Sequence, residues 1–390
     1  MNFTKLSYEI VQGIRSELLE LSQALHAHPE VAFEEVFAKD TQIKLLQKWG
    51  FAPQAGVYDM ETAFVADGHG DNNGKVFAFC SEYDALPGIG HGCGHNLIAT
   101  MALGAFFAAD KILRDRNLPG QVRLFGTPGE ESSGGKVFMS RKNCLDDVDA
   151  VMMVHPASQT QIDPGSTSIR RYNVTFHGKA AHAAASPELG INAMDAVMML
   201  INGLTFMRQQ LPEHARIHTM VTDSGLKLNI IPEKASCSVC LRSASAKWDE
   251  IMGERLKNMI KGAELMTGAT AEVTTPTPGY KSRKPNRIMN NMWMENMKTL
   301  GIETLIPEHG GRGSSDFGDF SRIRPGIHPY LGITTGIIPV HSSEFAAAAI
   351  SDQAFEQALK GAAAMAAISL QFLSDPKLQA DIKADFDNTK

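Results

Sequence analysis

A chain of 390 residues is longer than one hydrophobic core usually serves, so we expect two domains. Its 43% hydrophobic and 21% charged residues are typical of a globular protein and exclude a disordered or fibrous one. The net charge of −6 and the lack of a long basic run argue against a nucleic acid partner. No stretch reaches the roughly 18 apolar residues of a membrane span, and the charged N-terminus is unlike a signal peptide. We therefore expect a cytoplasmic protein that does not bind a membrane.

The first third of the chain alternates helix and strand patterns. The segments RSELLELSQALHAH and KDTQIKLLQKWGF have the apolar spacing of helices, and so does LIATMALGAFFAADKIL, for which Asn96 is placed as the cap. The short apolar runs KVFAFC, QVRLFGT and DAVMMV are bounded by turn residues. This alternation predicts buried parallel strands joined by crossover helices.

From about Ser168 the pattern changes to alternating strands, namely RRYNVTFHG, ARIHTMVTDSG, KASCSVCLRS and ATAEVTTP. Two helical stretches, Pro187–Gln210 and Lys247–Met266, separate them, and the chain ends in an Ala-rich helix at Ala354–Phe372. We therefore expect an α/β fold. Its mostly parallel sheet forms a discontinuous domain at residues 1–167 and 281–390, and residues 168–280 form an inserted α+β domain.

The five cysteines are odd in number and scattered, which predicts reduced thiols rather than a disulfide framework; they are Cys80, Cys93, Cys144, Cys237 and Cys240. The last two form a C-x-x-C motif within a predicted strand. Because residues three apart in a strand point to opposite faces, we expect this pair to be structural.

Ionisable residues follow each predicted parallel strand. Glu82, Asp84, His91, Cys93 and His95 follow KVFAFC, Glu130 and Glu131 follow QVRLFGTPG, and His155 follows DAVMMV. The carboxyl ends of parallel strands share one sheet edge, where ligands bind. We therefore expect these residues to converge there.

Cys93 and His95 are two residues apart, so both side chains can bind one ion. A sulfur and an imidazole ligand favour zinc, with manganese and cobalt as alternatives. Taken alone, the pair would more often be a buried thiol beside a satisfied histidine. In Glu130-Glu131 one acid could bind metal while the other acts as general base, or both could stabilise a helix N-terminus. With His155 and His341 there are five ligands, enough for two ions roughly 3.5–4 Å apart.

Six segments resemble, in order and over nearly the whole chain, the aminoacylase/carboxypeptidase family of dinuclear metallohydrolases (peptidase family M-twenty, subfamily D). They are FCSEYDALPGIGHGCGHN, FGTPGEESSGGKVFMSRKNCLDDVDAVMMVHP, FHGKAAHAAASPELGINAMDAV, LKLNIIPEKASCSVCLR, GSSDFGDFS and PVHSSEF. Within this family, HGCGHNLIAT and GSSDFGDFS are most similar to the p-aminobenzoyl-glutamate hydrolase and β-alanyl-dipeptidase-like branch.

The resemblance implies a metal-dependent amidohydrolase that cleaves N-acyl amino acids, aminoacyl-glutamate conjugates or dipeptides. It implies Cys93, His95, Glu131, His155 and His341 as ligands of two divalent ions and Glu130 as the general base. The inserted domain would be a lid through which the chain forms a homodimer. Its His182 would reach the partner's site to stabilise the oxyanion, and Asn229 and Arg242 would hold the substrate carboxylate, for which guanidinium is well suited.

One departure concerns Glu82-Tyr83-Asp84, where many relatives carry a His-x-Asp. No histidine ligand then comes from that strand end; Asp84 would orient a ligand, and Glu82 could be a ligand itself. His26 and His28 are interpreted as structural, and Asp316 as a residue that shapes the pocket. A thiol hydrolase with Cys93 as nucleophile and a non-catalytic ligand-binding protein of the same fold are the alternatives.

Overall fold

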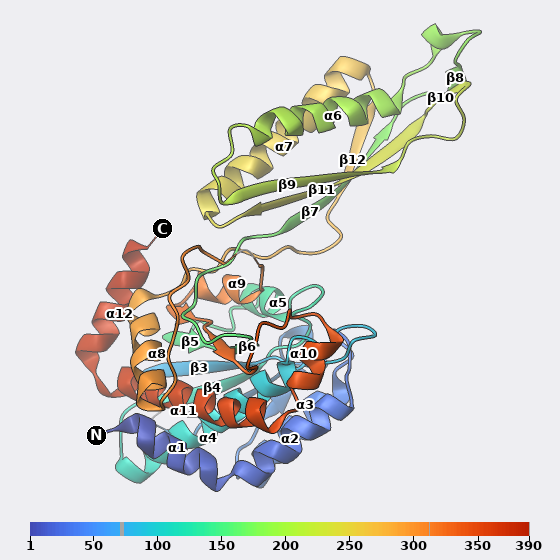
Figure 1. Cartoon of the computed structure of the whole chain (residues 1–390). Coiled ribbons are helices and arrows are strands. Elements are labelled where there is room, and N and C mark those ends of the chain that lie inside the picture. The colour runs from blue at the N-terminus through green and yellow to red at the C-terminus, as the bar shows by residue number, and fades with distance from the viewer. Residues whose placement is uncertain (71–73, 312, 390) are drawn as a thin grey trace. The chain divides into compact units, whose positions relative to one another are not determined.

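A computed structural model describes residues 1–70, 74–311 and 313–389. The chain forms two compact units (Figure 1). The larger unit comprises Met1–Gly165, Arg283–Gly311 and Asp316–Lys390, and the smaller unit comprises Ser166–Ser282 and Arg312–Ser315. Each unit encloses a hydrophobic core of its own.

A six-stranded sheet forms the centre of the larger unit, in the order β1-β2-β4-β3-β5-β13. The pairs β4-β3, β3-β5 and β5-β13 are parallel, and the two pairs at the β1 edge are antiparallel, so the predicted mostly parallel sheet is confirmed. The strands are β1 Gln54–Ala55, β2 Phe64–Asp67, β3 Val76–Ser81, β4 Gln121–Gly126, β5 Ala150–Met152 and β13 Gly326–Ile327. Two further strands, β6 His155–Ala157 and β14 Tyr330–Gly332, form a separate parallel pair.

Helices cover both faces of this sheet. They are α1 Phe3–Gly13, α2 Arg15–Ala27, α3 Val36–Lys48, α4 His95–Arg116, α5 Gly135–Arg141, α8 Arg287–Thr299, α9 Phe317–Ser321, α10 Ser343–Ala348, α11 Asp352–Ser374 and α12 Pro376–Asn388. On β3, Phe77 and Phe79 join the core cluster that contains α4 and α11, whereas Ala78 and Cys80 join the cluster that contains residues of α5 and α9. After Lys75, the run VFAFC is apolar throughout because successive side chains enter two different cores.

The predicted cap of α4 is wrong. The helix begins at His95, Gly94 precedes it in a left-handed conformation, and Asn96 lies within its first turn. The Asn96 amide instead donates hydrogen bonds to Ser22 Oγ and to the Ala349 carbonyl, each at 3.0 Å. By length and composition α4 could cross a membrane, but nearly all of it is buried in the larger unit, as in the core helix of a globular domain.

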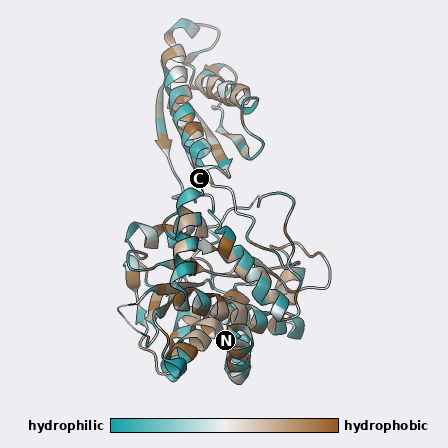
Figure 2. Cartoon of the chain, turned by 90° about the vertical axis from the view of Figure 1, so that its left-hand side faces the viewer, coloured by the Kyte–Doolittle hydropathy of each residue, from teal (hydrophilic) through white to brown (hydrophobic). Residues whose placement is uncertain are grey.

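The smaller unit is an antiparallel sheet of order β12-β7-β11-β9 covered by two helices, which is the predicted α+β texture. Its elements are β7 Arg170–His177, β8 Ala181–His182, α6 Ala193–Arg208, β9 Ala215–Asp223, β10 Ile230–Ile231, β11 Lys234–Ser243, α7 Ala246–Thr267 and β12 Thr270–Thr274. Figure 2 shows hydrophobic and hydrophilic residues alternating along its helices, whose apolar side chains pack on the sheet. The short strands β8 and β10 pair separately.

All five cysteines are free thiols, as predicted. On β11 the Cys237 side chain is buried, whereas Cys240 lies on the opposite, partly exposed face. The C-x-x-C pair therefore does not face one common ligand.

Candidate active site and metal centre

The candidate ligands lie at the carboxyl ends of three adjacent parallel strands of the larger unit. Glu82 and Asp84 follow β3, the Glu130-Glu131 pair follows β4, and His155 follows β5. Cys93 and His95 come from the loop before α4 and from its first residue. The sheet thus gathers side chains that are far apart in the sequence.

Three overlapping groups of side chains bring their ligand atoms within 4.8 Å of one another. They are Cys93 with His95 and His155, Cys93 with Glu131 and His341, and His95 with Glu130 and Glu131. All five predicted metal ligands therefore meet in one cluster, and Cys93, His95 and Glu131 are each shared between two groups. Such sharing suits two neighbouring cations.

His95 is oriented by a carboxylate. Its Nδ1 lies 3.1 Å from Asp84 Oδ1, and the other oxygen of Asp84 accepts a hydrogen bond of 2.9 Å from the Glu131 amide. An Nδ1–H donated to Asp84 leaves the Nε2 lone pair for a cation, which is the usual arrangement behind a metal-binding histidine. The structure thus places Asp84 behind the ligands, where it fixes both His95 and the Glu131 backbone.

Several buried polar atoms of this cluster have no hydrogen-bond partner among the described residues. They include His95 Nε2, Glu131 Oε1 and Glu82 Oε2. His95 Nε2 lies 3.8 Å from Glu131 Oε1 and 3.6 Å from Glu82 Oε2. Buried acceptors left unpaired in a carboxylate-rich site are costly unless a cation satisfies them, so the residues fit a divalent metal.

The two remaining histidines approach from other elements. His155 Nδ1 lies 2.7 Å from the Pro156 carbonyl, which fixes that nitrogen as the donor. Burial, followed by the charge of His95, lowers the pKa of His155 to about 3, so its ring is neutral, as a metal ligand requires. His341 is exposed, lies 3.7 Å from Glu131 Oε2, and has a backbone φ of 63°. Non-glycine residues rarely adopt this conformation, and such strain is concentrated at functional sites.

Glu130 has the electrostatic environment of a general base. Burial and then the neighbouring charges of Glu82, Glu131 and Asp316 raise its pKa well above the ordinary range. A carboxylate with a raised pKa accepts a proton more readily than an exposed one. A bound cation would offset part of this shift.

Cys93 is not activated as a nucleophile. It is 5% exposed, and burial raises the pKa of its thiol far above the usual range. Reactive cysteines instead have lowered pKa values and an accessible thiolate. The site therefore favours Cys93 as a ligand over the thiol-hydrolase alternative.

The smaller unit carries the other three predicted residues. His182 is exposed on β8 and pairs with Ile230 of β10, and the adjacent Ala183 amide donates to the Asn229 carbonyl. Arg242 lies in the four-stranded sheet, near the end of β11 and eight residues from its first residue, or roughly 26 Å at 3.3 Å per residue. The fold brings His182 and Asn229 together but separates Arg242 from both.

Sequence reasoning missed Lys136, the second residue of α5, which follows the Glu130-Glu131 turn. Its ammonium group is fully buried, 2.5 Å from Glu82 Oε1 and 2.8 Å from Asp316 Oδ1. A lone lysine after two glycines carries no metal or catalytic signature. The only available signal was its place between the Glu130-Glu131 turn and the apolar start of a helix.

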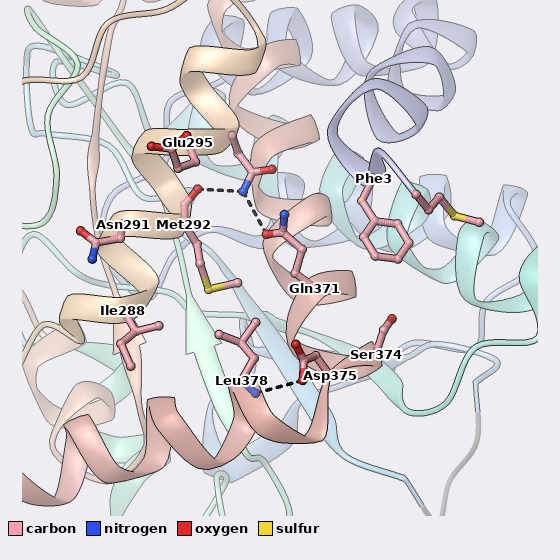
Figure 3. A pocket seen from close by; sticks show the side chains of 11 residues that line it. Phe3, Ile288, Asn291, Met292, Glu295, Gln371, Ser374, Asp375 and Leu378 are labelled. Atoms are coloured by element: carbon pink, nitrogen blue, oxygen red, sulfur yellow. Dashed lines mark hydrogen bonds between the residues drawn. The ribbon is translucent and has the colours of Figure 1, made fainter.

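The larger unit also has cavities away from this cluster. One, of about 520 Å³, is lined by residues of α8, α11 and α12 and by the N-terminus, with Phe3, Met292, Gln371 and Leu378 around it (Figure 3). None of the predicted ligands lines it. Another of similar volume lies beside the Glu130-Glu131 turn and includes Phe33, Tyr58 and Phe138.

A mostly parallel sheet with a cysteine, three histidines and paired glutamates at its carboxyl edge defines a metal-dependent hydrolase. The chain belongs to peptidase family M20/M25/M40, whose sequence profile matches residues 69–369. The predicted family is therefore confirmed, and with it the enzyme class, a metallohydrolase that cleaves amide bonds.

Two curated relatives support the assignment. The chain is 32% identical over 401 residues to a human Xaa-Arg dipeptidase, covering 97% of this chain and 91% of the relative. It is 32% identical over 313 residues to one of the subunits of a p-aminobenzoyl-glutamate hydrolase from Escherichia coli, covering 75% of this chain and 64% of the relative.

Two solved structures share the fold. A dinuclear metal binding peptidase of Bacillus subtilis has a TM-score of 0.70 at 22% identity, covering 92% of this chain and 99% of the other. An aminobenzoyl-glutamate utilization protein of Klebsiella pneumoniae has a TM-score of 0.67 at 19% identity, covering 94% and 98%. The predicted fold class is confirmed.

Proposed function

We propose that this enzyme hydrolyses the amide bond of a small substrate with a free carboxylate, such as a dipeptide, an N-acyl amino acid or an aminoacyl-glutamate conjugate. The names of relatives include a dipeptidase, a p-aminobenzoyl-glutamate hydrolase and an N-acetylcysteine deacetylase. The observation that carries the proposal is the convergence of five ligand side chains around buried atoms without partners. The larger unit is then the catalytic domain and the smaller unit the lid.

The ligand set indicates two zinc ions, with manganese or cobalt as substitutes. Cys93, His95, Glu131, His155 and His341 offer sulfur, nitrogen and oxygen donors, a combination that zinc accepts readily. Bound ions would polarise the substrate carbonyl and lower the pKa of a water molecule.

The residues of this chain then have separate roles in the reaction. Glu130 takes the proton of the attacking water and passes it to the departing amine. Asp84 keeps His95 in the tautomer that a ligand needs. His182 donates to the developing oxyanion, and Asn229 and Arg242 bind the substrate carboxylate.

We also propose that the lid forms a homodimer. Asn229 directly precedes β10, before the first residue of β11, whereas Arg242 lies near the far end of β11. One carboxylate can therefore contact both only if each comes from a different copy. The lid offers an apolar surface for a second copy. It is formed by Met220 on the edge strand β9 and by Met198 and Met199 on α6, whose side chains are 44–63% exposed. Exposed apolar surface on an unpaired edge strand is characteristic of an interface.

The proposal is tested with metal-stripped protein on a panel of dipeptides, N-acyl amino acids and p-aminobenzoyl-glutamate, with zinc, manganese or cobalt restored. We expect activity only after metal is restored. Activity that survives complete stripping would favour the thiol hydrolase, and metal binding without turnover of any substrate would favour the non-catalytic alternative. Sedimentation of the purified protein tests whether it is a dimer. Fractionation of cells that contain the protein tests whether it is found with the soluble cytoplasmic contents.

A further inference from the structure

The fully buried lysine beside the metal cluster joins two carboxylates to which the proposed function gives no role. Lys136 Nζ lies 2.5 Å from Glu82 Oε1 and 2.8 Å from Asp316 Oδ1, and the side chains of all three residues are fully buried. Burying three charges is expensive, and a buried ion pair often stabilises a fold less than apolar residues of the same volume would. A contribution to stability is therefore a poor reason for burying these three charged side chains.

Both side-chain oxygens of Asp316 bind Lys136. It precedes the first residue of α9, yet its side chain makes no capping hydrogen bond there. Its Oδ2 accepts a 3.0 Å hydrogen bond from the Lys136 backbone amide while its Oδ1 binds the ammonium group. Both oxygens thus fix one residue, and Lys136 cannot turn away from Glu82 without breaking these contacts.

Glu82 uses only one of its oxygens in this way. Its Oε1 binds Lys136, whereas its Oε2 is buried, has no hydrogen-bond partner among the described residues, and lies 3.6 Å from His95 Nε2. Two ligand atoms bound at about 2.1 Å in tetrahedral geometry are about 3.4 Å apart. The separation of these two unpaired atoms is therefore close to that expected of two ligands on one cation.

We propose that Glu82 is a sixth ligand of the metal centre, bound through Oε2, and that Lys136 and Asp316 are positioning residues that hold its carboxylate in place. This inference rests on the proposed function, because it requires that the cluster around His95 binds divalent cations. Glu82 then supplies a ligand from the end of β3, where no histidine is available. The charge of Lys136 also lets a third acid lie near Glu130 and Glu131 without a further uncompensated negative charge.

The test is calorimetric titration of Zn²⁺ into metal-stripped protein. Glu82→Gln keeps an oxygen for Lys136 but loses the charged ligand, and we expect its weaker site to bind Zn²⁺ at least 10-fold less tightly than the parent. Asp316→Asn acts only through Lys136, so we expect a smaller loss. The matched control is Asp110→Asn, which removes a buried carboxylate bound to the His69 amide and to Arg114 and should leave Zn²⁺ affinity unchanged.

The outcomes are distinct. Parent-like Zn²⁺ affinity in Glu82→Gln, with loss in Glu131→Gln, would overturn the assignment of Glu82 while leaving the proposed function intact. A parent that binds no divalent cation would overturn both. If Glu82→Gln does not fold, Asp316→Asn decides: reduced affinity with a normal urea midpoint supports the positioning role, and unchanged affinity refutes it.

Discussion

The two units hold their functional residues in opposite ways. In the larger unit most of the candidate site is buried, and several of its side chains are fixed by another, as His95 is by Asp84 and Glu82 by Lys136. In the smaller unit His182 is exposed, and its ring accepts hydrogen bonds only from the amides of Ala184 and Ala185 among the described residues. The first site is preorganised within one chain, whereas the second needs a substrate or another copy to complete it.

Substitutions in the two units should therefore have different effects. Changes in the larger unit should alter metal binding or the chemical step, because the proposed ligands and the proposed general base lie there. Changes in the smaller unit should alter oxyanion stabilisation and substrate affinity without removing metal.

The largest effect is expected for Glu130→Gln. The amide cannot accept the proton of the attacking water, so kcat should fall at least roughly 10²-fold while the zinc content stays normal. Steady-state kinetics and elemental analysis of the same sample measure both. Glu188→Gln, at an exposed position of the smaller unit, is the control; near-normal turnover of Glu130→Gln would contradict its role.

The fold was predictable where the apolar pattern is strong, and single residues were not predictable where their roles depend on distant partners. Buried elements carry strong periodic patterns, so β3, β4, the four lid strands and α11 were identified from apolar spacing alone. The clustering of the five candidate ligands could be predicted because residues that follow neighbouring parallel strands meet at one edge of the sheet. Lys136 was missed because its role depends on partners 54 and 180 residues away, which no local pattern encodes. Asn96 was misassigned because a glycine in left-handed conformation ends the preceding loop without a side-chain cap.

The next effect is expected for His182→Ala, which should lower kcat by about 10²-fold, the usual cost of losing an oxyanion donor. If His182 acts on the partner's site, mixing His182→Ala with Glu130→Gln protomers should restore activity. Each hybrid dimer then contains one site with both residues intact. Mixtures no more active than the separate variants would show that His182 works within its own chain.

A smaller effect is expected for Arg242→Ala. Its Nη2 donates to Ser314 Oγ at 2.8 Å, and its buried Nε has no hydrogen-bond partner among the described residues. Loss of a charged hydrogen bond to the substrate carboxylate should raise KM about 10-fold or more, with kcat less affected. Arg171→Ala on β7 is the control. An unchanged KM, or an equal effect on substrates whose carboxylate is amidated, would contradict carboxylate recognition by Arg242.

The smallest effect on activity is expected at Glu35, which lies beneath the Glu130-Glu131 turn and whose substitution should change stability instead. Glu35 is fully buried; its Oε1 accepts a 2.8 Å hydrogen bond from the Gly129 amide, and its Oε2 has no hydrogen-bond partner among the described residues. Burial, and then the charge of Asp84, raise the pKa of Glu35 from 4.5 to about 7.

Because the folded-state pKa is the higher one, the stability that protonated Glu35 contributes is complete below pH 4.5 and is lost as the pH rises through 7. Glu35→Gln keeps the acceptor for Gly129 and cannot ionise, so we expect it to be up to about 3 kcal/mol more stable than the parent at pH 8 and equal to it near pH 4. Urea unfolding at the two pH values measures the difference. A gain of the same size at both would show that packing, not ionisation, is responsible.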